Sequence, residues 1–435
     1  MDDKLHLEKI KSEMIDLAKE YFQINKNDVF VPNISSVPVS GKVLDENDLI
    51  NTILSSLDMW YTAGDFTKQF EKLIAQKLGL RHSLFVNSGS SANLLAITGL
   101  KILYNLSDGD EIITSAVGFP TTINPIIQNN LRPVLIDAEL DTLNIDAEKI
   151  ETMITKKTKG IVIAHTLGIP FNLEKIKEIC EKYNLFLMED NCDSFGSTYK
   201  NKLTGTFGDV STLSFYPAHH ITTGEGGAVV TSNTKLKKIM ESLRDWGRDC
   251  YCPPGKDNTC KKRYDWELGE LPKGYDHKYI YSLIGYNLKA TDFQAALGVS
   301  QIEKLDGFIQ QRRENYQYLF KSFQKFSQFS LINKPANSDP SWFGFPVLIN
   351  KDQSFERQEL LKFYEERKIG TRLLFGGNIK KQPAYKDIEF STTKLDNADF
   401  ILENCFWLGI YPGLNKDMLD FIISSTSEFL EKYDS

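Results

Sequence analysis

The chain contains no run of about eighteen apolar residues, the length that a membrane-spanning helix needs. Its first residues, Met1-Asp2-Asp3-Lys4, open a segment of mixed charge without the apolar stretch of a signal peptide. An excess of basic residues is also missing, because 58 Asp and Glu against 51 Lys and Arg give a formal charge of -7. Proteins that bind nucleic acid neutralise phosphates with basic patches, so this composition argues against such a partner. We expect a cytoplasmic protein with no nucleic-acid and no membrane partner.

Cysteine is scarce, with six in 435 residues. In a chain without an export signal, clustered thiols are more often metal ligands than disulfides. Four of them have 57, 1 and 7 residues between them, a spacing that differs from ferredoxin and zinc-finger patterns. These four are Cys192, Cys250, Cys252 and Cys260. Four thiolates suit zinc as well as an iron-sulfur cluster, whereas Cys180 and Cys405 have the surroundings of buried core thiols.

Internal repeats and low-complexity tracts are absent, and 41% apolar with 25% charged residues is typical of a globular protein. Between residues 83 and 231, short apolar strands alternate with helices of about ten residues, one of them over residues 147–155. This alternation predicts parallel βαβ units. It then breaks into a loop, 246–285, which is rich in Cys, Gly, Pro, Lys and Asp. A loop of that length within a compact domain is usually functional or disordered.

The expected organisation has three parts. Residues 1–40 form an N-terminal helix and arm, in which the apolar spacing over 4–24 predicts an amphipathic helix packed on the main body. Residues 41–300 form a large domain, and 301–435 form a smaller α/β domain. A long helix, beginning near residue 291, joins the two.

One stretch, Ser214 to Gly227, carries most of the chemistry. It reads Ser-Phe-Tyr-Pro-Ala-His-His-Ile-Thr-Thr-Gly-Glu-Gly-Gly, so that two adjacent histidines lie between a hydroxyl and glycine-rich turns. Upstream, Asp190 ends an apolar strand, at the edge where open α/β sheets bind ligands. Residues 87–92, Asn-Ser-Gly-Ser-Ser-Ala, make a small-residue turn before a helix, and such a turn suits a phosphate. Together these features suggest a cofactor pocket.

In this order, the turn, an aromatic residue, the strand-end Asp and the Ser-Phe and Gly-Glu-Gly-Gly elements resemble the DegT/DnrJ/EryC/StrS sugar aminotransferases. That family belongs to the fold-type I pyridoxal-phosphate superfamily, and the resemblance covers most of the chain. It implies an aspartate-aminotransferase-like α/β fold, with a large domain built on a mostly parallel sheet flanked by helices and a smaller C-terminal α/β domain.

The resemblance also implies the cofactor-binding residues. Gly89, Ser90 and Ser214 would hold the phosphate, and Asn287 would reach it from a neighbouring subunit, which implies a homodimer. Without the resemblance, a serine before a helix is equally well explained as a cap.

Two further residues would contact the cofactor ring. Asp190 would keep the ring nitrogen protonated, and Phe119 would stack on the ring. A strand-end Asp can also be a surface acid or a helix cap, and a Phe in such a turn can belong to the core.

Five residues after Ser214, where the family has its Schiff-base lysine, this chain has His219. A histidine can move a proton near neutrality because its ordinary pKa is about 6.5, but it cannot bind the cofactor covalently. The amine must then come from pyridoxamine phosphate, and the expected reaction is dehydration instead of amino transfer. His220 is the competing candidate for the base. Asp193 is a further departure, since the aminotransferases often carry Gln or His there.

Within the family the pattern resembles the 3-dehydrases of deoxysugar synthesis, and the cysteine spacing narrows the resemblance to the iron-sulfur type acting on CDP-4-keto-6-deoxy-D-glucose. This implies a 2Fe-2S cluster on the four cysteines and an NADH-dependent iron-sulfur flavoprotein reductase as partner. Cys192 follows Asp190 by two residues, about 7 Å of extended chain, so a cluster bound there would lie near the cofactor. The alternatives are a cluster-free enzyme acting on a GDP-linked sugar and a non-catalytic member that binds zinc.

Overall fold

The large domain is built on an eight-stranded sheet with the strand order β1-β9-β8-β5-β4-β2-β3-β14. The computed structural model describes residues 2–24 and 29–433. All pairs in the sheet are parallel except those of β9, which is antiparallel to both of its neighbours. The strands are β1 (His82–Val86), β2 (Glu111–Ser115), β3 (Arg132–Ile136), β4 (Thr158–Ala164), β5 (Phe186–Asp190), β8 (Val210–Ser214), β9 (Gly227–Thr231) and β14 (Ser391–Thr392). The predicted parallel sheet is therefore confirmed.

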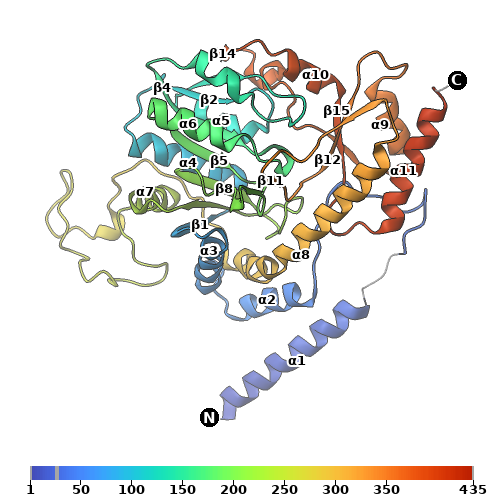
Figure 1. The fold of residues 1–435 in the computed structure, drawn as a ribbon. Coiled ribbons are helices and arrows are strands. Elements are labelled where there is room, and N and C mark those ends of the chain that lie inside the picture. The colour runs from blue at the N-terminus through green and yellow to red at the C-terminus, as the bar shows by residue number, and fades with distance from the viewer. Residues whose placement is uncertain (1, 25–28, 434–435) are drawn as a thin grey trace.

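Helices cover the sheet on both sides (Figure 1), which explains why its strands are apolar on both faces. They are α3 (Asp65–Leu78), α4 (Gly89–Leu103), α5 (Pro120–Gln128), α6 (Leu173–Tyr183) and α7 (Thr234–Arg244). The segment predicted as a helix over 147–155 is instead a 3-10 helix, η1 (Ala147–Met153), and a second one, η2 (Thr166–Gly168), follows β4. Cys180 and Cys405 are buried, as predicted.

A smaller domain follows the long helix α8 (Asp292–Phe323), which crosses the molecule obliquely (Figure 1). Its antiparallel sheet has the order β10-β12-β15-β13, and a three-stranded sheet, β11-β6-β7, joins the two domains. The strands are β10 (Phe329–Leu331), β12 (Phe345–Ile349), β13 (Thr371–Leu373), β15 (Cys405–Leu408), β6 (Thr198–Tyr199), β7 (Lys202–Leu203) and β11 (Ser338–Asp339). The remaining elements are η4 (Ile379–Lys381), η5 (Pro383–Tyr385), α9 (Arg357–Glu366), α10 (Asp396–Asn404) and α11 (Lys416–Glu431).

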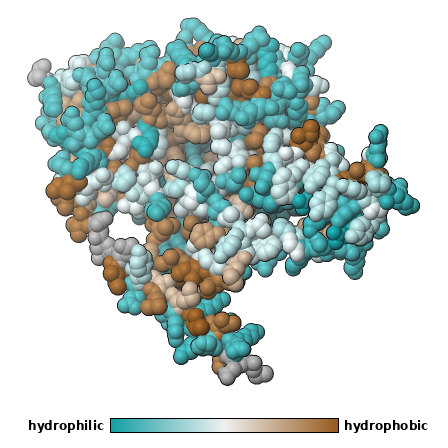
Figure 2. Space-filling view, turned by 180° about the vertical axis from the view of Figure 1, so that it is seen from behind, coloured by the Kyte–Doolittle hydropathy of each residue, from teal (hydrophilic) through white to brown (hydrophobic). Residues whose placement is uncertain are grey.

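The N-terminal helix α1 (Asp2–Ile24) projects from the body and contacts it through α2 (Glu46–Leu57), which lies against α8. Figure 2 shows apolar side chains exposed along the projecting helix. Leu5 is 74% exposed and Leu17 is 64% exposed. The expectation that this helix packs on the main body therefore holds only for its contact with α2, and much of its apolar side is exposed. Apolar spacing predicted the helix but could not show what its apolar side meets.

The loop 246–285 also projects from the large domain, between α7 and α8 (Figure 1, yellow). Apart from the short 3-10 helix η3 (His277–Tyr279), it contains no named helix or strand. In the ranges that the structure describes, no helix is both long and apolar enough to cross a bilayer.

Candidate active site

Asp190 lies at the carboxyl end of β5, and its side chain is buried and fixed by three donors. Oδ2 accepts hydrogen bonds from Asn93 Nδ2 at 2.9 Å and from Thr122 Oγ1 at 2.7 Å. Oδ1 accepts one from the backbone N–H of Cys192 at 3.2 Å. Thr212 Oγ1 donates to Asn93 Oδ1 at 2.6 Å and so orients that amide. The carboxylate is held at the edge of the sheet where ligands of α/β folds bind.

Gly89 and Ser90 begin α4, and the structure brings Gly89 close to Ser214 at the end of β8. Ser88 caps the helix by accepting the N–H of Ser91 at 3.0 Å. A Cβ on Gly89 would lie 2.5 Å from the Ser214 Cβ, so only glycine allows this close approach. The first amides of a helix have no partner within the helix and attract anions.

Asn287 lies near the same turn of the same chain. The carbonyl of Leu288 accepts the backbone N–H of Asn87 at 2.9 Å, and Asn287 itself is exposed. An exposed side chain at this place is free to contact a second subunit, as the resemblance implies.

Phe119 precedes α5, and its ring is 50% exposed. The ring makes an edge-to-face contact with Phe375, with 6.1 Å between centroids. A half-exposed aromatic ring fixed in this way offers a face for a planar ligand.

His219 lies in the loop after β8, and its side chain is 15% exposed. Its Nδ1 is 3.5 Å from Asp193 Oδ1, and its ring is tilted against Phe343 with 5.0 Å between centroids. Burial lowers the pKa of His219 to about 4, although the charge of Asp190 opposes this shift. The imidazole is therefore neutral near pH 7 and able to accept a proton.

His220 points elsewhere. Its Nε2 donates to the backbone carbonyl of Ser341 at 2.8 Å, and burial lowers its pKa well below the ordinary value. Since this nitrogen is already bound to the small domain, His220 serves packing. The two adjacent histidines thus have different environments, which their sequence alone did not show.

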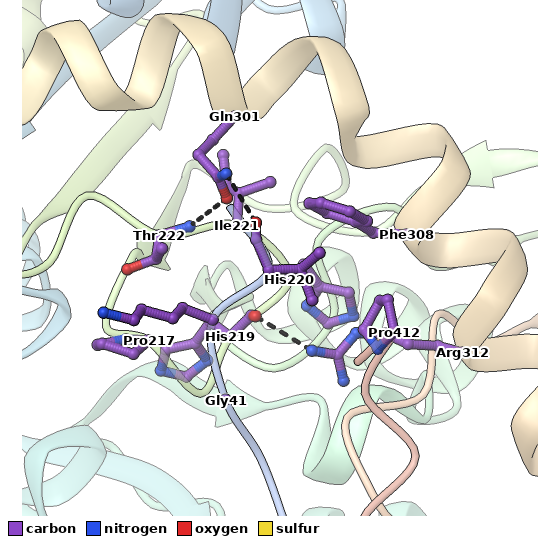
Figure 3. Close-up of a pocket in the computed structure, with 12 residues that line it drawn as sticks. Gly41, Pro217, His219, His220, Ile221, Thr222, Gln301, Phe308, Arg312 and Pro412 are labelled. Carbon is purple, nitrogen blue, oxygen red and sulfur yellow. Dashed lines mark hydrogen bonds between the residues drawn. The ribbon is translucent and has the colours of Figure 1, made fainter. Parts of the chain in front are cut away.

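Asp193 and Arg312 both lie next to His219. Burial, and then the neighbouring charge of Asp190, raise the pKa of Asp193 to about 8, so this carboxyl is protonated at neutral pH. Arg312, from α8, is buried and donates to four backbone carbonyls, of which Figure 3 shows that of His219. These belong to His219 at 3.1 Å, Phe343 at 3.2 Å, Trp342 at 3.4 Å and Ala218 at 3.5 Å. Arg312 thereby ties the His219 loop to the small domain.

A narrow crevice lies behind this loop, between α8 and the segment that contains Gly41 and Val43 (Figure 3). Gln301 bridges it, because its Oε1 accepts the N–H of Thr222 at 3.2 Å and its Nε2 donates to the carbonyl of Val43 at 3.0 Å. Two side chains of α8, Gln301 and Arg312, therefore form hydrogen bonds to the backbone of the His219 loop.

The predicted metal ligands lie in two places. Cys192 is half-buried at the candidate active site, where desolvation and the Asp190 carboxylate hold the pKa of its thiol well above the usual range. Cys250, Cys252 and Cys260 instead surround His277 in the projecting loop. Within the described chain, the four cysteines are therefore not assembled into one set of ligands, and His277 is a candidate ligand that the sequence analysis missed.

The chain belongs to the DegT/DnrJ/EryC1/StrS aminotransferase family, which matches residues 44–427. It is 52% identical to the lipopolysaccharide biosynthesis protein RfbH of Salmonella typhimurium, over 92% of this chain and 93% of that protein. It is 48% identical to the dTDP-4-dehydro-2,6-dideoxy-D-glucose 3-dehydratase of Saccharopolyspora spinosa, over 97% and 92%. Among solved structures, the E. coli GDP-4-keto-6-deoxy-D-mannose-3-dehydratase with bound hydrated PLP matches with a TM-score of 0.81 and 30% identity, over 89% of this chain and 98% of that one. The predicted family and fold class are confirmed.

Proposed function

We propose that this protein is a pyridoxamine-phosphate-dependent 3-dehydratase of a nucleotide-linked 4-keto-6-deoxyhexose. The observation that carries the proposal is His219, which replaces the family's covalent lysine and lies as a neutral base beside Asp193 and Asp190. Two kinds of relatives support it, because their names give 3-dehydration of dTDP-linked and GDP-linked deoxysugars.

The described residues fit the cofactor. Gly89 lets the start of α4 lie against Ser214, and Ser90 and Ser214 would supply hydroxyls to a phosphate there. Phe119 offers an exposed ring face, and Asp190 offers a fixed carboxylate to a ring nitrogen. When bound, pyridoxamine phosphate supplies an amine for the sugar ketone and an electron sink for the loss of the neighbouring hydroxyl.

His219 moves the proton. Since its Nδ1 is buried near Asp193, Nε2 is the nitrogen left to take a proton at the reacting centre and to return one to the departing hydroxyl. Arg312 holds the backbone of this loop, so the imidazole keeps its position while it changes charge.

We further propose CDP-4-keto-6-deoxy-D-glucose as the substrate, in the synthesis of 3,6-dideoxyhexoses for surface polysaccharide. The resemblance supports the nucleotide, and the name of RfbH as a lipopolysaccharide biosynthesis protein supports the pathway. An NADH-dependent iron-sulfur flavoprotein reductase would supply the two electrons for deoxygenation. A homodimer, to which Asn287 contributes, completes this proposal.

The test is a panel of CDP-, dTDP- and GDP-linked 4-keto-6-deoxyhexoses, incubated anaerobically with the protein and pyridoxamine phosphate. We expect mass spectrometry to show loss of one water, fastest with the CDP sugar. Faster reaction of a sugar linked to another nucleotide would change only the proposed substrate and not the proposed reaction. Formation of a 4-amino sugar with glutamate as donor would overturn dehydration, and no reaction in any arm would favour the non-catalytic alternative.

Gly89→Ala should weaken cofactor binding roughly tenfold to a hundredfold, because the added methyl group would overlap Ser214 and this kind of overlap costs about 1–3 kcal/mol. Titration of pyridoxamine phosphate by absorbance measures the Kd. Gly307→Ala is the matched control, since a Cβ there meets nothing within 4 Å. Equal affinity of the two variants would contradict the proposed phosphate position.

Asp193→Asn should alter the pH profile more than the rate at pH 7. In the wild type, Asp193 ionises near pH 8, and the new charge 3.5 Å from Nδ1 makes His219 a stronger base. We therefore expect kcat/KM to rise through about pH 8 in the wild type and to stay flat there in the variant. Asp387→Asn, on the surface, is the control. A rise that persists in Asp193→Asn would assign that titration to another group.

A further inference from the structure

The turn between β13 and η4 contains a bulky residue in a backbone conformation that favours glycine. Phe375 has a φ of 49°, which lies in the left-handed region. For a side chain of this size the conformation costs free energy, and it persists only where surrounding contacts impose it. Such residues gather at functional sites, so the contacts of Phe375 indicate what the strained turn does.

Backbone pairing between the two domains helps to impose the turn. The N–H of Gly376 donates to the carbonyl of Gly118 at 3.2 Å, and the N–H of Ile379 donates to that of Ala116 at 2.9 Å. Both acceptors belong to the segment that follows β2 and ends at Phe119. The small domain therefore holds this segment of the large domain immediately before Phe119.

The residues around Phe375 are closely packed. Leu374 is 2% exposed and belongs to the hydrophobic core. A Cβ on Gly377, which also has a positive φ, would lie 2.3 Å from Leu402 Cδ1, so the backbone there lies directly against α10. Close packing on both sides keeps Phe375 in the strained conformation.

The side chain of Phe375 meets the ring of Phe119 edge-on. The two ring centroids are 6.1 Å apart, and the planes are inclined at 89°. The Phe119 ring is 50% exposed, and rotation of a phenylalanine ring about its last side-chain bond has broad energy minima. A neighbouring ring can decide the angle, because aromatic pairs favour the edge-to-face arrangement. Phe375 therefore determines the plane of the Phe119 ring.

We propose that Phe375 is a positioning residue, which fixes the Phe119 ring at the angle at which a planar cofactor stacks on it. The inference rests on the proposed function, because it takes pyridoxamine phosphate as that cofactor. Phe375 acts through Phe119 and not through a contact of its own with the cofactor. A Phe375 that only covered the hydrophobic core, against which it packs, would affect stability and leave a bound cofactor unchanged.

The test is a double-mutant cycle of Phe375→Leu and Phe119→Leu, read by cofactor binding. Leucine keeps an apolar side chain but removes the ring. Absorbance titration with pyridoxamine phosphate should show that Phe375→Leu raises the Kd roughly threefold to tenfold, the usual contribution of an aromatic pair. In the Phe119→Leu background the same change should raise the Kd less than about twofold, because the ring that Phe375 positions is absent.

Circular dichroism of the protein saturated with cofactor gives a second readout, since the cofactor band depends on how the ring is held. The band should weaken in Phe375→Leu and recover in Phe375→Tyr, which retains the ring and keeps the test valid if the leucine variant folds poorly. Chemical denaturation establishes that each variant is folded. Asp352→Gly, at an exposed left-handed residue of the small domain, is the control and should change neither the Kd nor the band.

The outcomes separate the positioning role from the proposed function. A wild type that binds no pyridoxamine phosphate would overturn both. A wild type that binds it, together with an unchanged Kd and band in Phe375→Leu, would overturn the positioning role alone. An effect of Phe375→Leu that persists undiminished without the Phe119 ring, or no recovery in Phe375→Tyr, would do the same.

Discussion

Replacing His219 by Asn should lower the rate of dehydration by roughly a hundredfold to ten-thousandfold, the usual contribution of a general acid-base group. Asparagine has a similar size but cannot take a proton, whereas the neutral His219 imidazole can. The residues proposed to bind the cofactor do not include His219, so the affinity for pyridoxamine phosphate should remain within a few fold. Turnover and cofactor titration on the same sample separate the two quantities.

His220→Asn is the matched comparison, because His220 follows His219 in the chain, donates to the carbonyl of Ser341 and has no proposed proton to move. That variant should lose stability more than turnover per folded molecule. A His219→Lys variant should retain pyridoxal phosphate after dialysis, as expected at the position of the family lysine. Wild-type turnover in His219→Asn, together with a large loss in His220→Asn, would assign the base to His220.

Replacing Arg312 by Met should lower the free energy of unfolding by about 3–5 kcal/mol, since it leaves buried carbonyls without their donor. Two of these carbonyls belong to Ala218 and His219, so the position of the base should loosen and kcat should fall with stability. Chemical denaturation measures the first effect, and turnover at a temperature where the variant is folded measures the second.

Arg313→Met is the control from the next position of α8. Arg313 is partly exposed and pairs with Asp339, so water can replace what the side chain supplies, and the expected loss is about 1 kcal/mol or less. Equal losses in the two variants would show that the Arg312 contacts contribute little to stability.

The fold could be predicted because its signals are local. Apolar strands and amphipathic helices alternate along the large domain. The spacing of the apolar residues in each element indicates which of its sides is buried against the neighbouring layer. The exposure of the apolar side of α1 could not be predicted in this way. An amphipathic pattern indicates that the helix has an apolar side, but it does not identify what that side contacts. The 3-10 helix η1 was likewise beyond the pattern, since its apolar spacing over seven residues is the same for either helix type.

Part of the candidate active site could also be predicted from the sequence, and part of it could not. Residues in short motifs, such as Asp190 and Ser214, could be found from the sequence. Their supports could not, because Asn93, Thr122 and Arg312 are single polar residues within helices and approach the site only after folding. The position of His277 beside the cysteines could not be predicted for a similar reason. It follows Cys260 by seventeen positions, and no sequence motif includes both residues.

The most direct test of the central claim is oxygen exchange in water enriched in oxygen-18. The protein, loaded with pyridoxamine phosphate, is incubated with a CDP-linked 4-keto-6-deoxyhexose without any reductant or amino donor. Reversible loss of the hydroxyl beside the ketone should bring solvent oxygen to carbon 3, and His219→Asn should slow this exchange by at least about a hundredfold. Absence of label at carbon 3 in the wild type, or equal labelling in the variant, would contradict dehydration by His219.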